Sequence, residues 1–316
     1  MRVAILDDYQ NVALTSADWG RLPADAEIAV FDQHIADTDA LVAALEPYDV
    51  VVMMRERTPM TADRLARLPK LRLLVTTNMR NASIDFAAAA EAGITVCGTA
   101  GVDTATVEHT WALILSMARH VPAEDAGMRA GGWQHTVGFG LEGRILGILG
   151  VGRLGRLVAG IGVAFGMEVL AWSLNLDPAR AEEAGATAVT KEELFRRSDI
   201  VSVHYKLGER SIGLVGATEL GWMRPTSYLV NTSRAPIVDT GALLAALHEG
   251  RIAGAALDVY DVEPLPADHP IRSAPRTVLT PHLGYVTDTE YNLWYEHVVE
   301  DIVAFAAGSP VRVLTA

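Results

Sequence analysis

The chain has 316 residues, of which 50% are hydrophobic and 21% are charged, and its formal net charge is −13. This length suits about two globular domains, and the composition is ordinary for a folded protein. The acidic balance argues against a nucleic-acid-binding surface, which normally needs a basic face. An acidic chain can still hold a local cationic pocket for an anionic small molecule.

The N-terminal residues and the single cysteine indicate in which cellular compartment the protein is expected. The opening MRVAILDDYQ runs into a short apolar strand and then acidic residues, unlike a signal peptide. No run of about 18 or more apolar residues is present to span a bilayer. Cys97 has no disulfide partner and no zinc-site spacing, and its run GITVCG predicts a small buried side chain. We therefore expect a cytoplasmic protein that engages no membrane.

Short apolar runs alternate with helical patterns along almost the whole chain, which predicts a parallel α/β architecture. Before residue 100, strands are expected in RVAILD, EIAVFD, DVVVMM, RLLVTT and ITVCGT, with helices over DTDALVAALEP and TADRLARLP. This rhythm suits a compact flavodoxin-like unit. A long helix is expected over residues 103–121, and the Gly-rich stretch 122–142 is interpreted as a connecting arm.

A second α/β series follows the arm. Its strands are expected in RILGILG, MEVLAWS, DIVSVHY, SYLVNTS, IAGAALDV and TVLTPHL. These runs are continuously apolar, as expected where helices cover both faces of a parallel sheet. The stretch from Val286 onward predicts one amphipathic helix and a tail.

The first strand of this second series ends in a glycine motif. Gly150, Gly152 and Gly155 form G-x-G-x-x-G between a strand and a helix. The first two glycines allow a tight turn and close approach of a pyrophosphate, and the third lets the helix pack on the strand. The helix N-terminus then offers N–H groups to the phosphates. This context predicts a dinucleotide-binding (Rossmann) domain.

Polar side chains follow the later strands of this series. In SYLVNTSRAPIVD, Pro236 fits badly inside a central strand, so the strand should end near Thr232 or Ser233, with Arg234 at its carboxyl end. Ligands of open α/β sheets bind outside the carboxyl ends of the strands. The ends in chain order are Gly150, Ser173, His204, Thr232 to Arg234, Asp258 and His282. This order predicts a site for a small anion beside a nicotinamide.

These residues resemble the D-isomer-specific 2-hydroxyacid dehydrogenases. The resemblance rests on GILGVGRLG, LVNTSRAPIVD, GAALDVYDVEPLP and TPHLG, and it extends over essentially the whole chain. It implies a flavodoxin-like substrate-binding domain formed by residues 1–100 and 285–316, and a Rossmann dinucleotide-binding domain over residues 101–284. It also implies a homodimer that forms through the dinucleotide-binding domain.

The resemblance further implies the site residues. The catalytic set falls on Arg234, Glu263 and His282. The expected cofactor contacts combine residues that the resemblance implies with the glycine motif and the strand ends. They are Thr106, Gly150, Gly152, Arg153, Leu154, Gly155, Ser173, His204, Thr232, Asp258 and Gly284. The loop TNMRNA matches the place where family members offer backbone amides to a carboxylate, which adds Asn78, Met79, Arg80 and Asn81. The strand-end rule adds Arg55, for a second anionic group of the substrate.

The implied reaction is hydride transfer between NAD(P)H and a small 2-oxo acid. A histidine can supply the proton near neutral pH, which is the role expected of His282. Glu263 would fix its tautomer, and Arg234 would hold the substrate carboxylate with a two-pronged geometry that lysine lacks. No metal is expected, because imidazolium and guanidinium already face the developing charge.

The sequence departs from the family pattern at two places. Ala235 follows the arginine where glycine is common, and Ser173 stands about 20 residues past the motif, where an acid that binds the ribose is expected. Ser173 is either a ribose contact or a turn serine with no ligand role. Because an acid would repel a 2′-phosphate, we expect use of both NAD and NADP, with a slight lean toward NADP.

Two rival functions stay open on the sequence alone. A corepressor-like protein of the same fold would bind NAD(H) to sense redox state without turnover. A formate dehydrogenase-like enzyme would pair its histidine with glutamine, which Glu263 argues against.

Overall fold

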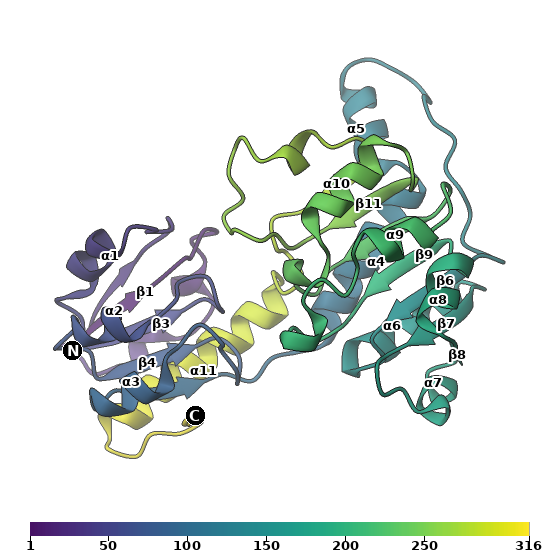
Figure 1. Ribbon diagram of the computed structural model, residues 1–316. Coiled ribbons are helices and arrows are strands. Elements are labelled where there is room, and N and C mark those ends of the chain that lie inside the picture. The colour runs from purple at the N-terminus through teal and green to yellow at the C-terminus, as the bar shows by residue number, and fades with distance from the viewer. Residues whose placement is uncertain (316) are drawn as a thin grey trace. The chain divides into compact units, whose positions relative to one another are not determined.

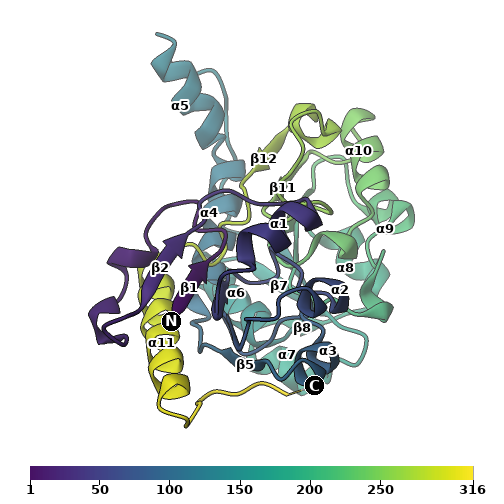
Figure 2. The same cartoon turned by 90° about the vertical axis from the view of Figure 1, so that its left-hand side faces the viewer.

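The computed structural model describes residues 1–315. The chain divides into two compact units: unit 1 comprises Met1–Val102 and Val286–Ala316, and unit 2 comprises Asp103–Tyr285. Each unit contains one parallel β-sheet (Figures 1 and 2). The predicted α/β class with two parallel-sheet domains is therefore confirmed.

Unit 1 contains a five-stranded sheet in the order β2-β1-β3-β4-β5. The strands are β1 (Arg2–Ile5), β2 (Glu27–Val30), β3 (Val50–Met53), β4 (Leu73–Thr76) and β5 (Thr95–Gly98). All residues of β3 and β4 are buried, as their uninterrupted apolar runs predict. The helices are α1 (Thr38–Leu45), α2 (Ala62–Ala66), α3 (Phe86–Glu91) and α11 (Asp288–Ala306), and 3-10 turns span Ala13–Thr15 and Trp19–Arg21.

The C-terminal end of the chain completes unit 1. In α11 the side chains of Trp294 and Tyr295 are fully buried. Beyond the helix, Val313 forms an antiparallel bridge with Cys97, and the Leu314 amide donates to the Val96 carbonyl at 2.8 Å. The tail therefore pairs with the edge strand β5, and the prediction that Cys97 is a small buried side chain is confirmed.

Unit 2 contains a seven-stranded sheet in the order β12-β11-β10-β9-β6-β7-β8. The strands are β6 (Ile145–Leu149), β7 (Glu168–Trp172), β8 (Thr187–Ala188), β9 (Ile200–Val203), β10 (Tyr228–Asn231), β11 (Gly254–Leu257) and β12 (Thr277–Leu279). The helices are α4 (Thr104–Ala118), α5 (Val121–Arg129), α6 (Arg153–Ala164), α7 (Pro178–Glu183), α8 (Lys191–Arg197), α9 (Ala217–Trp222) and α10 (Thr240–His248). Short 3-10 turns span Glu209–Ser211, Ala235–Ile237 and Pro270–Ser273.

Helices cover both faces of the unit 2 sheet. Alternate strand residues point to opposite faces: Leu146 and Ile148 pack in one core with α4 and α6, whereas Leu149 packs in a second core with α8, α9 and α10. All strands of the sheet run parallel, so their carboxyl ends meet at one edge. Apart from Thr106 on α4, the predicted catalytic and cofactor residues follow those ends.

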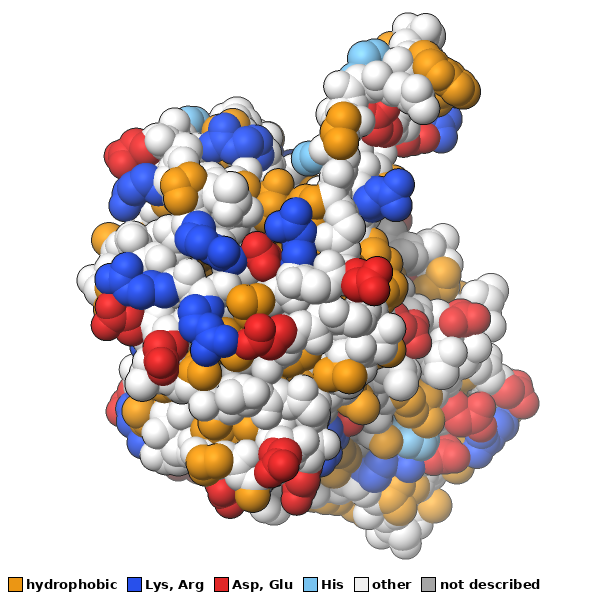
Figure 3. Space-filling model, turned by 90° about the vertical axis from the view of Figure 1, so that its right-hand side faces the viewer, with side chains coloured by type: hydrophobic (Ala, Val, Ile, Leu, Met, Phe, Trp, Pro, Cys, Tyr) orange, Lys and Arg blue, Asp and Glu red, His pale blue; other side chains and the backbone are white. Residues whose placement is uncertain are grey.

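The prediction for residues 103–142 was partly wrong. The long helix α4 ends at Ala118, and His120 adopts a left-handed backbone (φ +54°) before a second helix, α5, begins inside the expected arm. No residue of α5 is buried, so no apolar stripe marks this helix in the sequence. α5 projects from the rest of unit 2, and hydrophobic side chains lie on the surface of the projecting arm (Figures 2 and 3).

Among residues 1–315, no helix combines the length and apolar character needed to cross a bilayer.

Candidate active site

The glycine loop lies between β6 and α6, as predicted. Gly150 has φ +104°, and a Cβ there would lie 2.8 Å from the backbone carbonyl carbon of His204. A Cβ on Gly155 would collide with the Gly150 carbonyl oxygen, whereas one on Gly152 would meet no atom within 4 Å. The loop thus combines two positions closed to side chains with an open one beside the N-terminus of α6. This geometry fits the pyrophosphate of a dinucleotide.

The end of β7 faces the glycine loop. The Val151 amide donates to Ser173 Oγ at 3.0 Å. The residue after Ser173, Leu174, donates its amide to the Tyr205 hydroxyl at 3.0 Å. In the same region Arg153 Nε lies 2.8 Å from Asp103 Oδ2. Ser173 therefore stands beside the loop with a hydroxyl proton still available to a further acceptor.

His204 follows β9 and is neutral. Its Nε2 lies 2.8 Å from the hydroxyl of the buried Ser202. Burial lowers the pKa of His204 to about 4, because a cationic ring loses its hydration there. At neutral pH this imidazole contributes hydrogen bonding without charge.

Arg234 belongs to a turn that the buried Asn231 holds in place. Strand β10 ends at Asn231, whose Oδ1 accepts from the Ser233 amide at 3.0 Å and whose Nδ2 donates to the Arg234 carbonyl at 3.1 Å. The guanidinium donates from Nη1 to the Ser233 carbonyl at 2.9 Å. Ala235, the departure from the family pattern, is buried and begins the 3-10 turn that follows. Arg234 thus lies at the carboxyl end of the strand, as predicted.

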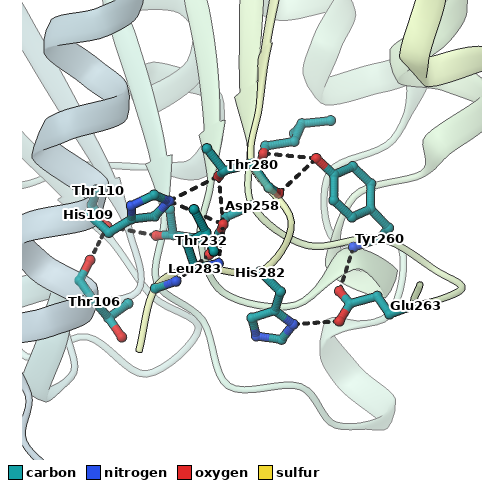
Figure 4. Close-up of polar contacts among 12 residues, drawn as sticks. Thr106, His109, Thr110, Thr232, Asp258, Tyr260, Glu263, Thr280, His282 and Leu283 are labelled. Atoms are coloured by element: carbon teal, nitrogen blue, oxygen red, sulfur yellow. Dashed lines mark hydrogen bonds and ion pairs between the residues drawn. The ribbon is translucent and has the colours of Figure 1, made fainter. Parts of the chain in front are cut away.

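Glu263 and His282 form a close pair (Figure 4). His282 Nδ1 lies 2.6 Å from Glu263 Oε2, and the other carboxylate oxygen accepts from the Tyr260 amide at 3.0 Å. A carboxylate only accepts hydrogen bonds, so Nδ1 carries the proton between the two side chains. The Tyr260 hydroxyl lies 3.0 Å from the Thr280 carbonyl, which links the two loops that carry the pair.

Asp258 lies at the centre of a hydrogen-bond network (Figure 4). Its carboxylate is almost completely buried and accepts from Thr280 Oγ1 at 2.6 Å, from the Leu283 amide at 2.7 Å and from the Gly284 amide at 2.8 Å. Both oxygens are therefore engaged by the segment that carries His282. Helix α4 supplies a further partner, His109, whose Nε2 lies 3.1 Å from Asp258 Oδ1.

His109 and Thr110 of α4 belong to this network and were not predicted from the sequence. On α4, the Thr110 hydroxyl donates to the Thr106 carbonyl at 2.8 Å and lies 2.7 Å from the Thr232 hydroxyl. His109 and Thr110 lie at helical spacing i+3 and i+4 from Thr106, which was predicted as a cofactor contact. That spacing was the available signal, since such residues share one helix face.

In unit 1 the predicted substrate residues follow β3 and β4. Arg55 has φ +55°, donates its amide to Thr77 Oγ1 at 2.9 Å and places its guanidinium carbon 5.9 Å from the centre of the Trp294 ring. The buried Asn81 side chain donates to the Arg55 carbonyl at 2.7 Å and to Thr76 Oγ1 at 2.8 Å. Asn81 therefore braces the two loops against each other.

Two amides of the TNMRNA loop already have acceptors. The Asn78 amide donates to Thr99 Oγ1 at 2.8 Å, and the Met79 amide donates to Asn78 Oδ1 at 2.7 Å. Asn78 also adopts φ +95°, a conformation unusual for a residue other than glycine. For the amides of Arg80 and Asn81, the described part of the chain shows no backbone or side-chain acceptor.

Comparison with known proteins identifies the family. A sequence model of the NAD-binding domain of D-isomer specific 2-hydroxyacid dehydrogenases matches residues 111–284. The chain is 42% identical over 256 residues to a glyoxylate reductase of Aeropyrum pernix, covering 78% of this chain and 76% of that protein. The chain belongs to the D-isomer specific 2-hydroxyacid dehydrogenase family.

Further relatives agree with this assignment. A glyoxylate reductase of Thermococcus litoralis is 37% identical, with 77% of this chain and 76% of that protein covered. A crystal structure of a phosphoglycerate oxidoreductase from Vibrio cholerae matches 98% of this chain and 100% of that chain, with 37% identity and a TM-score of 0.93. The predicted class, an NAD(P)-dependent D-2-hydroxyacid dehydrogenase, is confirmed.

Proposed function

We propose that this dehydrogenase reduces a small 2-oxo acid such as glyoxylate, with His282 as proton donor, Glu263 as its orienting partner and Arg234 as the carboxylate ligand. The observation that carries the proposal is the 2.6 Å contact between His282 Nδ1 and Glu263. His282 follows β12 and Arg234 follows β10. Both therefore lie at the same edge of the sheet, with only β11 between the two strands. The similarity to two glyoxylate reductases supports the choice of a small substrate.

The roles follow from the geometry of these side chains. With Nδ1–H committed to Glu263, Nε2 is the ring nitrogen that gives its proton to the carbonyl oxygen of the substrate. The Arg234 guanidinium is expected to bind the carboxylate through two parallel hydrogen bonds. The hydride for the carbonyl carbon would come from a reduced nicotinamide when it is bound. We propose that the cofactor is held by the glycine loop and the N-terminus of α6, together with Thr106, Arg153, Leu154, Ser173, His204, Thr232, Asp258 and Gly284.

Unit 1 is proposed to be the substrate-binding domain. The amides of Arg80 and Asn81 are the stronger candidates for contact with an anion, because those of Asn78 and Met79 are engaged within the chain.

Unit 2 is proposed to form a homodimer through its arm, where Trp133 and Val137 are 72% and 94% exposed. Val121 and Met128 of α5 are also more than half exposed, and apolar side chains gathered on one exposed segment commonly mark an interface. A monomeric mass by light scattering would contradict the dimer.

The proposal is tested by assaying 2-oxo acids of increasing side-chain size with NADH and with NADPH. We expect turnover with at least one small 2-oxo acid. Binding of the reduced cofactor without turnover of any 2-oxo acid would contradict the proposal and would favour the corepressor-like function. Oxidation of formate in the absence of 2-oxo acid reduction would also contradict it.

Cofactor choice is proposed to depend on Ser173. Wild-type enzyme should accept NADPH at least as well as NADH, because the Ser173 hydroxyl faces the glycine loop and brings no negative charge to the ribose. Ser173→Asp should shift the ratio of kcat/KM toward NADH by about tenfold, or roughly 1.4 kcal/mol, since a carboxylate repels a 2′-phosphate. The measurement is kcat/KM for both cofactors in both proteins, with Ser273→Asp as a control for added surface charge.

Two outcomes would contradict this prediction. A wild-type preference for NADH of more than about 100-fold, or roughly 2.7 kcal/mol, would mean that another residue excludes the phosphate. An unchanged ratio in Ser173→Asp would mean that the side chain does not face the ribose.

Arg55 is proposed to assist substrates that carry a second anionic group. Arg55→Ala should lower kcat/KM for a dicarboxylic 2-oxo acid about tenfold more than for glyoxylate, because a hydrogen bond to a charged group contributes about 1.5–3 kcal/mol. The control is Arg67→Ala, which removes a partly exposed ion pair with Asp39 at the end of α2. An equal effect of Arg55→Ala on the two substrates would show that Arg55 acts only through the fold of unit 1.

A further inference from the structure

The turn that carries His282 has a backbone that needs support. His282 adopts φ +57°, and its amide donates to the carbonyl of Thr280, two residues earlier, at 3.0 Å. A residue other than glycine is disfavoured in the left-handed region and keeps it only where the surroundings hold it there. The position of the imidazole in space therefore depends on the contacts that hold residues 280–284.

Asp258 provides that support from both sides of His282. It accepts the Thr280 hydroxyl before the histidine and the amides of Leu283 and Gly284 after it. Because Asp258 is only 1% exposed, water does not replace any of these hydrogen bonds. A shift of this carboxylate would move the turn on both sides of the imidazole together.

His109 completes the set of donors. Its Nε2 lies 2.9 Å from Thr280 Oγ1 and 3.1 Å from Asp258 Oδ1. Since the Thr280 hydroxyl gives its one proton to Asp258, its oxygen can only accept from His109. His109 therefore carries a proton on Nε2 and shares it between the two partners, which ties helix α4 to the turn (Figure 4).

We propose that His109 is a positioning residue for proton transfer, which keeps the His282 imidazole in reach of the substrate carbonyl through Thr280 and Asp258. The inference rests on the proposed role of His282 and adds to it a residue that contacts neither His282 nor Glu263. The same face of α4 also carries Thr110, which contacts Thr232. His109 thus belongs to a helix face that contacts the ends of β10, β11 and β12 at once.

His109→Leu should lower kcat about 10- to 100-fold, because a displacement of about 1 Å at a reacting group can have an effect of that size. The dissociation constant of NADPH, measured by its fluorescence, should stay within about threefold of wild type. The solvent deuterium isotope effect on kcat should rise, since proton transfer becomes slower than the other steps. His109→Gln should recover most of the activity, because an amide N–H can replace the Nε2 donor.

His248→Leu is the matched control, since His248 is an exposed histidine in the last turn of α10. Glyoxylate, or the best 2-oxo acid of the panel, serves as substrate, and thermal unfolding is recorded for each variant. If His109→Leu does not fold, Thr280→Val provides the same test, because it removes the hydroxyl link and keeps the side-chain shape. This variant should show the same fall in kcat and the same rise in the isotope effect.

Three outcomes would overturn the inference. They are a kcat within about twofold of wild type in His109→Leu, a loss of NADPH binding parallel to the loss of kcat, and a His109→Gln variant as poor as His109→Leu. Failure of the proposed function itself is distinguishable, because a His282→Asn variant would then keep its activity. If His282→Asn is inactive and His109→Leu is not, only the role of His109 is wrong.

Discussion

His282→Asn is expected to abolish reduction while cofactor binding stays nearly intact. The substitution removes the proton donor, and general acid–base catalysis typically contributes about 10²- to 10⁴-fold in rate. Asparagine suits this position because it tolerates the left-handed backbone that residue 282 adopts (φ +57°). The turn held by Asp258 is therefore expected to keep its shape. The measurement is single-turnover oxidation of NADPH by the 2-oxo acid, with NADPH binding followed separately by fluorescence.

The control for this variant is His248→Asn, at an exposed histidine of α10. It should leave turnover unchanged. If His282→Asn retained more than about a tenth of the wild-type rate with chemistry rate-limiting, His282 would not be the proton donor. A parallel loss of NADPH binding would mean that the substitution had damaged unit 2 more widely.

Arg234→Lys is expected to raise KM for the 2-oxo acid and to lower kcat together. The positive charge survives, but lysine has no planar pair of donors for the carboxylate. Lysine also lacks the separate Nη1 donor that contacts the Ser233 carbonyl at 2.9 Å, so its single ammonium group would have to serve both that carbonyl and the substrate. Loss of one hydrogen bond to a charged partner contributes about 1.5–3 kcal/mol, so kcat/KM should fall by at least about 10- to 100-fold.

The matched control is Arg224→Lys. Arg224 precedes β10, whereas Arg234 follows it, and Arg224 forms an ion pair with Asp199 at 3.0 Å. This control should change stability slightly and kinetics little, because it lies at the other end of the strand. If Arg234→Lys kept both kcat and KM within about threefold of wild type, Arg234 would act as a point charge or not at all.

The sequence alone located the elements that carry the site. Continuous apolar runs predicted the parallel strands, because helices cover both faces of the unit 2 sheet and bury nearly all residues of its central strands β6, β9, β10 and β11. Pro236 predicted the end of β10 near Thr232 or Ser233, and the strand ends at Asn231. Gly150, Gly152 and Gly155 predicted the dinucleotide loop because their missing side chains are themselves a local signal. These features depend on residues close together in the chain.

Hydrophobic patterns did not predict elements that bury no side chains, or elements that pair with a segment far away in the chain. Helix α5 has no buried residue, so hydrophobic periodicity could not reveal it. β8 has only two residues, Thr187–Ala188, which is too short for a pattern. The C-terminal tail pairs at Val313 with Cys97, far away in the chain. Periodicity reports burial along one segment and says nothing of which distant segment lies beside it.

The tertiary structure also decided how the predicted residues are used. Asp258 was predicted to contact the cofactor, and the fold gives its carboxylate a further task, because it accepts hydrogen bonds from Thr280, Leu283 and Gly284. Ser173 stood open between a ribose contact and a turn residue, and the fold places its oxygen on the Val151 amide. His109 became visible only when α4 packed beside β11 and β12. Hydrogen bonds between groups 149 or 171 residues apart form only after the backbone has folded. The sequence therefore predicted which residue types form the site, whereas the packing of α4 on the sheet determined which of them are hydrogen-bonded to one another.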